Sequence, residues 1–406
     1  MNREPRAGRG RPTGPRAFLL AASFLITLGS FAVLPYMSVL LHDRLGLGLG
    51  TVGVVLAVAS LVQFSGGVVG AALARRIGLR GTMLVALAVR TAGFGAFVPG
   101  LGSPVVAVGA LLLVSCGAAL YLPANKAYLV EGAREAERPR LLSMSGAAFN
   151  AGIALGPPAA APFVLSSPGV LFAVVTALFA AVGFGHAALP RTDGPGGVPS
   201  GSRASAGRPD GALLPFAVTV VSVYAFMFFQ HYLALYAVPR TSASFYGVVL
   251  MAYAGLIVIA QPLLSRWIAG LTYESATRVG FSAMAAGTAA IAWGGRTGIG
   301  AGAALICLGE IVLFLKNDLE ALARSSAAPA VVFGRQRLAA GIGAFASGVV
   351  GGQLYGMAEE AGRTEAFWLA VSLQCVVLPL SLTSAVRRGC AGVMARRTRS
   401  ARSSSS

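Results

Sequence analysis

The chain of 406 residues is 56% hydrophobic and 11% charged, with a mean hydropathy of +0.74 and a formal net charge of +18. Soluble domains carry roughly a quarter charged residues, so this composition excludes a chain that faces water all round. A basic chain suggests nucleic-acid binding, but that function needs the basic residues gathered on one soluble module. Here the basic residues lie at the ends of apolar runs, which indicates membrane topology and no nucleic-acid partner.

Twelve apolar runs of about 17 to 26 residues follow one another along the chain, a length that suits a helix crossing a hydrocarbon core of roughly 30 Å. Because lipid offers the backbone no hydrogen-bond partner, each run is predicted to be helical. The first run is longer than the apolar part of a signal peptide, so it is expected to be retained. The expected spans are residues 17–41, 50–73, 82–99, 104–125, 144–166, 169–189, 213–238, 245–268, 277–294, 298–318, 338–357 and 366–386.

The positions of the basic residues predict the orientation of these spans. If both termini are cytoplasmic, 25 of the 32 lysines and arginines fall in cytoplasmic segments and four in external loops. Lysine and arginine are enriched in the cytoplasmic loops of membrane proteins, so this asymmetry favours twelve spans with both termini inside. The protein is therefore expected to be a multi-pass protein of the cell inner (plasma) membrane.

Residues 191–211, between the sixth and seventh spans, are rich in Gly, Ser, Pro and Arg. This composition is typical of a flexible linker rather than a folded domain. We therefore expect a basic cytoplasmic tail, a six-helix bundle, a cytoplasmic linker, a second six-helix bundle and a second basic cytoplasmic tail. Their ranges are 1–16, 17–190, 191–211, 212–386 and 387–406.

The two halves also resemble each other in sequence. Residues 152–156 (GIALG) of span five correspond to residues 343–347 (GAFAS) of span eleven, and further on two alanines correspond to Gly351 and Gly352. In spans four and ten, residues 122–125 (LPAN) lie opposite residues 315–318 (LKND). Weak symmetry between two halves is the expected trace of a duplicated transporter.

With these features the chain resembles the major facilitator superfamily, and within it the twelve-span drug:proton antiporters. That family carries a pattern like G-x-L-A-D-R-x-G-R-R between spans two and three, and residues 71–80 read AALARRIGLR here. Arg75 replaces the aspartate of a charge relay at the cytoplasmic gate. The resemblance implies gating roles for Arg75, Arg76, Gly78 and Arg80. A basic loop that only orients the protein is the alternative.

Residues 152–161, GIALGPPAAA, are similar to the antiporter motif G-x-x-x-G-P-x-x-G-G, with alanines in place of the last two glycines. Small residues four positions apart let two helices approach closely, and a proline favours a bend. Gly152, Gly156 and Pro157 are therefore expected to form a packing motif, together with Gly351 and Gly352 in the other half. In the family this motif is associated with exporters, and a generic packing seam is the alternative.

One acidic residue lies deep within a span. An unpaired charge near mid-helix costs on the order of 2.5–3.5 kcal/mol, so such residues are candidates for function. Glu310 lies halfway along the tenth span, where residues 308–316 (LGEIVLFLK) resemble the L-G-E-x-x-x-F-P segment of related bacterial drug exporters. Glu310 is the predicted proton carrier, and Asp318 is a second candidate. A structural acid bound to a neighbouring helix or to Lys316 is the alternative.

Other polar and aromatic side chains within spans are candidates for a central substrate cavity. They are Tyr36, Arg90, Asn125, Gln230, His231, Tyr236 and Gln261. Each also has a structural interpretation. An arginine within a span can snorkel or form an ion pair, tyrosines near span ends anchor helices at the interface, and a lone histidine can serve in packing.

The sequence predicts a transporter and no enzyme. It contains no H-E-x-x-H motif, no G-x-x-x-x-G-K-[ST] loop and no paired cysteine spacing, so no metal, cofactor or nucleotide is expected. The predicted function is proton-coupled efflux of a small amphipathic organic compound by a monomer in the lipid bilayer. A facilitator or importer of a polar metabolite is one alternative, and a transport-inactive membrane sensor or assembly partner is another.

Overall fold

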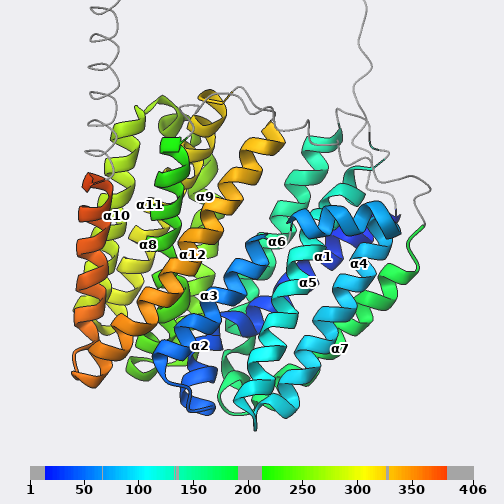
Figure 1. The fold of residues 1–406 in the computed structure, drawn as a ribbon, viewed down its shortest axis with the longest axis horizontal. Coiled ribbons are helices and arrows are strands. Elements are labelled where there is room, and N and C mark those ends of the chain that lie inside the picture. Colours follow the sequence, from blue (N-terminus) through cyan, green and yellow to red (C-terminus); the bar gives the residue numbers. More distant parts are fainter. Residues whose placement is uncertain are drawn as a thin grey trace, which may run out of the picture.

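The computed structural model in Figure 1 describes residues 14–65, 67–131, 133, 137–190, 213–325 and 329–381. Every regular element in these ranges is helical, which confirms the prediction of an all-α membrane protein. The predicted linker 191–211 and tail 387–406 lie outside the described residues, as does nearly all of the tail 1–16.

The first span changes its helical geometry partway along. It begins as α1 (Gly14–Val33), tightens into the 3-10 turn η1 (Leu34–Tyr36), and continues through α2 (Met37–Val39) into the π-helical turn η2 (Leu40–Arg44). Pro35 has no N–H to donate and therefore interrupts the regular hydrogen-bonding pattern. The span ends three residues later than predicted, at Arg44.

The remaining helices follow the predicted order with small shifts of their ends. Ten helices of the described chain are long and apolar enough to cross a membrane, and α3 and α10 occupy the second and ninth predicted positions. The helices are α3 (Leu49–Ser65), α4 (Gly67–Gly100), α5 (Pro104–Val130), α6 (Arg138–Val164), α7 (Pro168–Ala187), α8 (Leu213–Arg240), α9 (Ala243–Gly270), α10 (Tyr273–Trp293), α11 (Gly295–Ala323), α12 (Pro329–Glu360) and a last helix, Thr364–Ser381.

The connection between the second and third spans is a corner inside α4. The backbone turns at Gly78, where φ is 75° and ψ is 170°. A residue with a Cβ atom is strained at such a φ, whereas glycine is not. Just beyond the corner, the Arg80 side chain donates hydrogen bonds to the carbonyl oxygens of His186 and Ala187 at the end of α7. The basic loop is therefore fastened to a neighbouring helix end.

The helices form two groups that lie side by side in Figure 1, with α1–α7 in one and α8 to the last helix in the other. In the first group α4 packs on α5 and α7, and α1 packs on α6. In the second group α10 packs on α11, and α8 packs on α12. Two helix pairs, α3 with α12 and α6 with α9, join the groups. We call the interface between the two groups of helices the seam.

The glycines of the repeated segments make equivalent contacts in the two groups. A Cβ atom added to Gly152 on α6 would lie 2.7 Å from the Leu28 backbone nitrogen on α1. A Cβ atom added to Gly343 on α12 would lie 2.4 Å from the Val220 carbonyl oxygen on α8. Only a residue without a side chain lets these helix pairs approach so closely.

A second equivalence involves two asparagines. Asn125 on α5 donates from Nδ2 to Ser23 Oγ on α1 at 2.9 Å. Asn317 on α11 lies 3.5 Å, Nδ2 to Oγ, from Ser222 on α8. The alignment of the two halves predicts that Asn125 corresponds to Asp318. The residue that contacts a serine as Asn125 does is Asn317, one position earlier. Asp318 is exposed.

Candidate functional site

The acid predicted to carry protons lies between two helices of the second group. Glu310 is near the middle of α11, and the Tyr253 hydroxyl of α9 donates a hydrogen bond to its carboxylate. Lys316, one alternative partner, instead donates from Nζ to the carbonyl oxygens of Ala269 and Leu271, at 3.2 and 2.5 Å. Lys316 therefore caps the end of α9, and Glu310 is left with a tyrosine.

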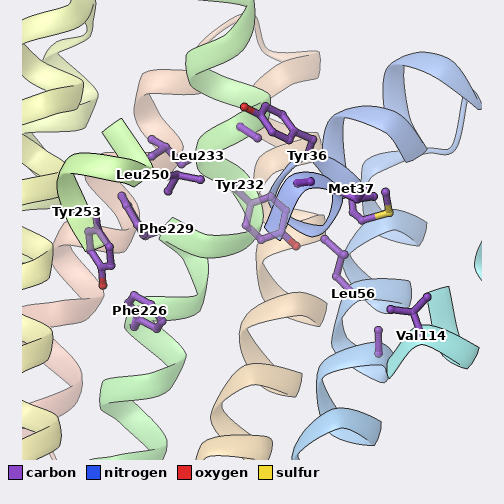
Figure 2. Close-up of a cluster of buried hydrophobic side chains, with 14 of the residues drawn as sticks. Tyr36, Met37, Leu56, Val114, Phe226, Phe229, Tyr232, Leu233, Leu250 and Tyr253 are labelled. Carbon is purple, nitrogen blue, oxygen red and sulfur yellow. The ribbon is translucent and has the colours of Figure 1, made fainter. Parts of the chain in front are cut away.

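Aromatic rings pack around Tyr253, the partner of Glu310. The Tyr253 ring stacks on Phe229 of α8 with centroids 5.1 Å apart, and it lies 6.4 Å from Phe226 (Figure 2). Phe314 of α11 meets Phe226 edge to face at 5.8 Å. The rings hold Tyr253 in one orientation, because offset-stacked aromatic neighbours restrict its rotation. An acid placed among apolar rings is costly to charge, which makes Glu310 a functional candidate.

A histidine contacts the opposite group of helices. His231 of α8 lies 3.3 Å, Nε2 to Oγ, from Ser60 of α3. Its other ring nitrogen, Nδ1, is buried with no hydrogen-bond partner in the described part of the chain. Gln230 beside it is half-buried. His231 is thus a polar contact across the seam between the two groups.

Arg90 is buried inside the first group and is 4% exposed. It donates to Ser30 Oγ at 2.5 Å and its guanidinium lies 4.6 Å from the centroid of the Phe179 ring. No salt bridge of the described residues includes it, and its Nε atom has no partner there. A Cβ atom on Gly117 would lie 2.3 Å from Arg90 Cγ, so this glycine makes room for the side chain. Within the described residues, Arg90 therefore neither extends toward water nor forms a salt bridge.

The tyrosine of the first span lies in the seam. Tyr36 donates from its hydroxyl toward two carbonyl oxygens, that of Pro157 on α6 at 3.0 Å and that of Ala243 on α9 at 3.2 Å. Tyr246 of α9 donates back to the carbonyl oxygen of Pro35 at 3.2 Å. Pro157 of the antiporter-like motif thus shares the Tyr36 hydroxyl with the second group, and it also faces Gly247 of α9.

Apart from Gly352, which packs on α3 in the seam, the other candidates lie away from the seam contacts. Tyr236 packs against Trp368 inside the second group, and Gln261 is exposed on α9. Arg75 and Arg76 are exposed beside the corner of α4. Gly351 faces the Tyr232 ring, and Gly352 faces the start of α3.

Sequence reasoning missed two residues of this region, Tyr253 and Ser60. Tyr253 is one of 10 tyrosines, and nothing in its local sequence points to Glu310, which is 57 positions away. Ser60 lies in an apolar run. The packing of α9 on α11 brings Tyr253 to Glu310, and the approach of α8 to α3 brings His231 to Ser60.

The sequence was compared with protein families and with curated relatives. The family described as Major Facilitator Superfamily matches residues 19–357. The multidrug resistance protein MdtH of Aeromonas hydrophila is 31% identical over 153 residues, which are 36% of this chain and 37% of that protein. The MdtH protein of Cronobacter sakazakii is 33% identical over 139 residues, 34% of each chain. The chain thus matches about a third of the length of these relatives.

Solved structures share the arrangement of the helices at low sequence identity. The nucleoside transporter NupG has a TM-score of 0.70 at 14% identity, over 92% of this chain and 99% of that chain. The human organic anion transporter MFSD10 has a TM-score of 0.61 at 17% identity, over 92% of this chain and all of that chain. At these identities the likeness supports the fold alone.

Proposed function

The chain belongs to the Major Facilitator Superfamily, and from this premise we propose that it is a proton-coupled exporter of a small amphipathic organic compound. It is a transporter of the lipid bilayer and not an enzyme. The partial similarity to multidrug resistance proteins supports export of a foreign or toxic compound. The predicted charge asymmetry supports cytoplasmic termini and the inner membrane.

The observation that carries the proposal is the Glu310–Tyr253 pair. Glu310 forms no salt bridge within the described residues, so a proton is the partner that can neutralise its charge among the aromatic rings. The Tyr253 hydroxyl can donate to the carboxylate when the proton has left. Glu310 would therefore bind a proton when the site faces outside and release it when the site faces the cytoplasm.

The contacts across the seam support an alternating-access cycle. The pairs Tyr36–Ala243, Tyr246–Pro35 and Gly53–Gly348 join the two groups toward the end that holds the turns 45–48 and 361–363. The predicted topology places this end outside the cell. The conformation is then closed to the outside, and the two groups would rock about the seam to open it.

The test is transport in everted membrane vesicles with an imposed pH gradient. A strain that lacks its own exporters would first be screened for compounds whose toxicity falls when the chain is expressed. Glu310→Gln is expected to abolish gradient-driven movement of such a compound while leaving exchange of the compound down its own gradient. Glu320→Gln on the same helix is the matched control, because Glu320 pairs with Arg324 four residues on.

Two results would contradict the proposal. Gradient-driven transport that survives Glu310→Gln would remove the proton-coupling role. Accumulation of the compound in intact cells that falls when the gene is deleted would indicate import, as in the alternative of a facilitator or importer.

A further inference from the structure

A contact between a histidine and a carboxylate joins the two groups of helices at the end where they are closed. His42 in η2 lies 3.5 Å, Nε2 to Oε2, from Glu359 at the end of α12. Among the ion pairs seen within the described part of the chain, this one connects the two groups and the others stay inside one group. Next to it Gly50 packs on Gln353, so that a Cβ atom on Gly50 would lie 2.9 Å from the amide nitrogen.

The hydrogen bonds of the His42 ring decide which nitrogen carries a proton. Nδ1 lies 2.9 Å from the carbonyl oxygen of Leu47. A carbonyl oxygen only accepts, so Nδ1 must donate. A neutral imidazole has one N–H, and in this geometry it is used on Leu47. Nε2 of the neutral ring then turns a lone pair toward two carboxylates, those of Glu359 and of Asp43, the latter at 4.0 Å.

A second proton on His42 reverses this interaction. Nε2 becomes a donor aimed at Glu359, and the ring becomes a cation between two carboxylates. We propose that His42 and Glu359 form a proton-binding latch that holds the two groups of helices together at this end when His42 is protonated, and loosens when it is neutral. Histidine is the one side chain whose unperturbed charge change falls between about pH 5 and 8.

Few charged or titratable groups lie on the elements around the latch. Asp43 and Arg44 share η2 with His42, while α2 and α3, which pack on η2, contain no titratable residue. The end of α12 near His42 carries Tyr355, Glu359 and Glu360, and Arg363 follows in the next turn; Arg335 and Arg337 lie near the other end of α12. Arg240 of α8 lies close to Tyr355 but is occupied by Glu365 at 2.7 Å. His42 is thus the cation that this cluster of acids gains when it binds a proton.

The use of the latch in transport rests on the proposed function. If this end faces outside, the latch senses the external proton concentration. In a proton-coupled exporter, protonation from outside would favour closure of the external end after the compound has left. His42 would then assist the return step, whereas Glu310 carries the proton across.

A distance measurement tests the latch without substrate or pH gradient. The full chain in lipid nanodiscs, with its four native cysteines replaced by serine, would carry spin labels at Gly48→Cys and Ala361→Cys. Both positions are exposed, and they belong to opposite groups. Because the latch is a partly exposed pair, we expect the ratio of short to long label distances to rise about two- to five-fold between pH 8 and pH 5.5.

Variants separate the latch from other causes of a pH response. His42→Gln and Glu359→Gln are expected to remove the response, and Glu365→Gln, which breaks a nearby pair within one group, is expected to keep it. His42→Lys should hold the short distance at both pH values. A response that persists in His42→Gln, or one that remains in His42→Lys, would overturn the proposal. Loss of export with an intact response would count against the export function and not against the latch.

Discussion

Tyr36 and Tyr246 meet edge to face across the seam, with ring centroids 5.2 Å apart. Tyr246 donates its hydroxyl hydrogen to the Pro35 carbonyl of the opposite group, and Tyr36 shares its own between Ala243 of the opposite group and Pro157 of its own group. Removing one such hydrogen bond costs about 0.5–1.5 kcal/mol. We expect Tyr36→Phe with Tyr246→Phe to lengthen the distance between labels at positions 48 and 361, because the closed end loses two of its ties.

Tyr224 provides a control for this double substitution. Its hydroxyl donates to Gln374 at 2.5 Å, within the second group. Tyr224→Phe should lower the thermal stability by a similar amount and leave the label distance unchanged. An equal lengthening in Tyr224→Phe would show that general loosening, and not the seam tyrosines, opens this end.

Gly152→Val and Gly343→Val should destabilise the protein to similar extents. Each added side chain would collide with the backbone of the facing helix, at 2.7 Å on α1 and 2.4 Å on α8. Overpacking of this kind costs about 1–3 kcal/mol, and backbone atoms cannot move aside as side chains do. Thermal unfolding followed by size-exclusion chromatography measures the loss. Gly146→Val is the control, since nothing lies within 4 Å of a Cβ atom there.

The fold could be predicted from the sequence because two strong signals agree. The length of the apolar runs gave the helices, and the alternation of arginines gave their number and order. Hydropathy correctly predicts a break between the second and third spans, where Gly78 lies. It does not predict that the backbone turns at this one residue while the helices on both sides continue up to it. The repeat was detected through Gly152 and Gly343, whose role depends only on size.

The candidate site was less accessible to such reasoning. Glu310 stood out because a lone acid in an apolar run is rare, whereas its partner Tyr253 looked like any other aromatic residue. Tyr236 shows the opposite failure, because its place in the sequence near His231 said nothing about its packing on Trp368. His231 and Tyr236 are five residues apart on α8, which turns them to different faces of the helix. The apolar pattern of a span that is buried on most sides does not show which face meets the seam.

Arg90→Met should keep or raise the thermal stability and reduce transport. Within the described residues Arg90 has no acidic partner, so methionine removes an uncompensated buried charge and retains an apolar stem of similar length. The loss of the hydrogen bond to Ser30 subtracts about 1 kcal/mol from this gain. Thermal unfolding and vesicle transport are measured on the same preparation. A variant that is clearly less stable would show that Arg90 holds the first group together.

Tyr253→Phe should weaken gradient-driven transport roughly tenfold, the effect of one hydrogen bond to a charged group. The ring remains stacked on Phe229, so the aromatic surroundings of Glu310 are kept and only the donor is lost. Because Glu310→Gln is expected to abolish gradient-driven transport, the coupling of the two residues is measured by a double-mutant cycle on thermal stability. If they act together, adding Tyr253→Phe to Glu310→Gln changes the stability less than Tyr253→Phe does alone, because the carboxylate that accepted the hydrogen bond has gone. Two effects on stability that simply add would show that Tyr253 does not act through Glu310.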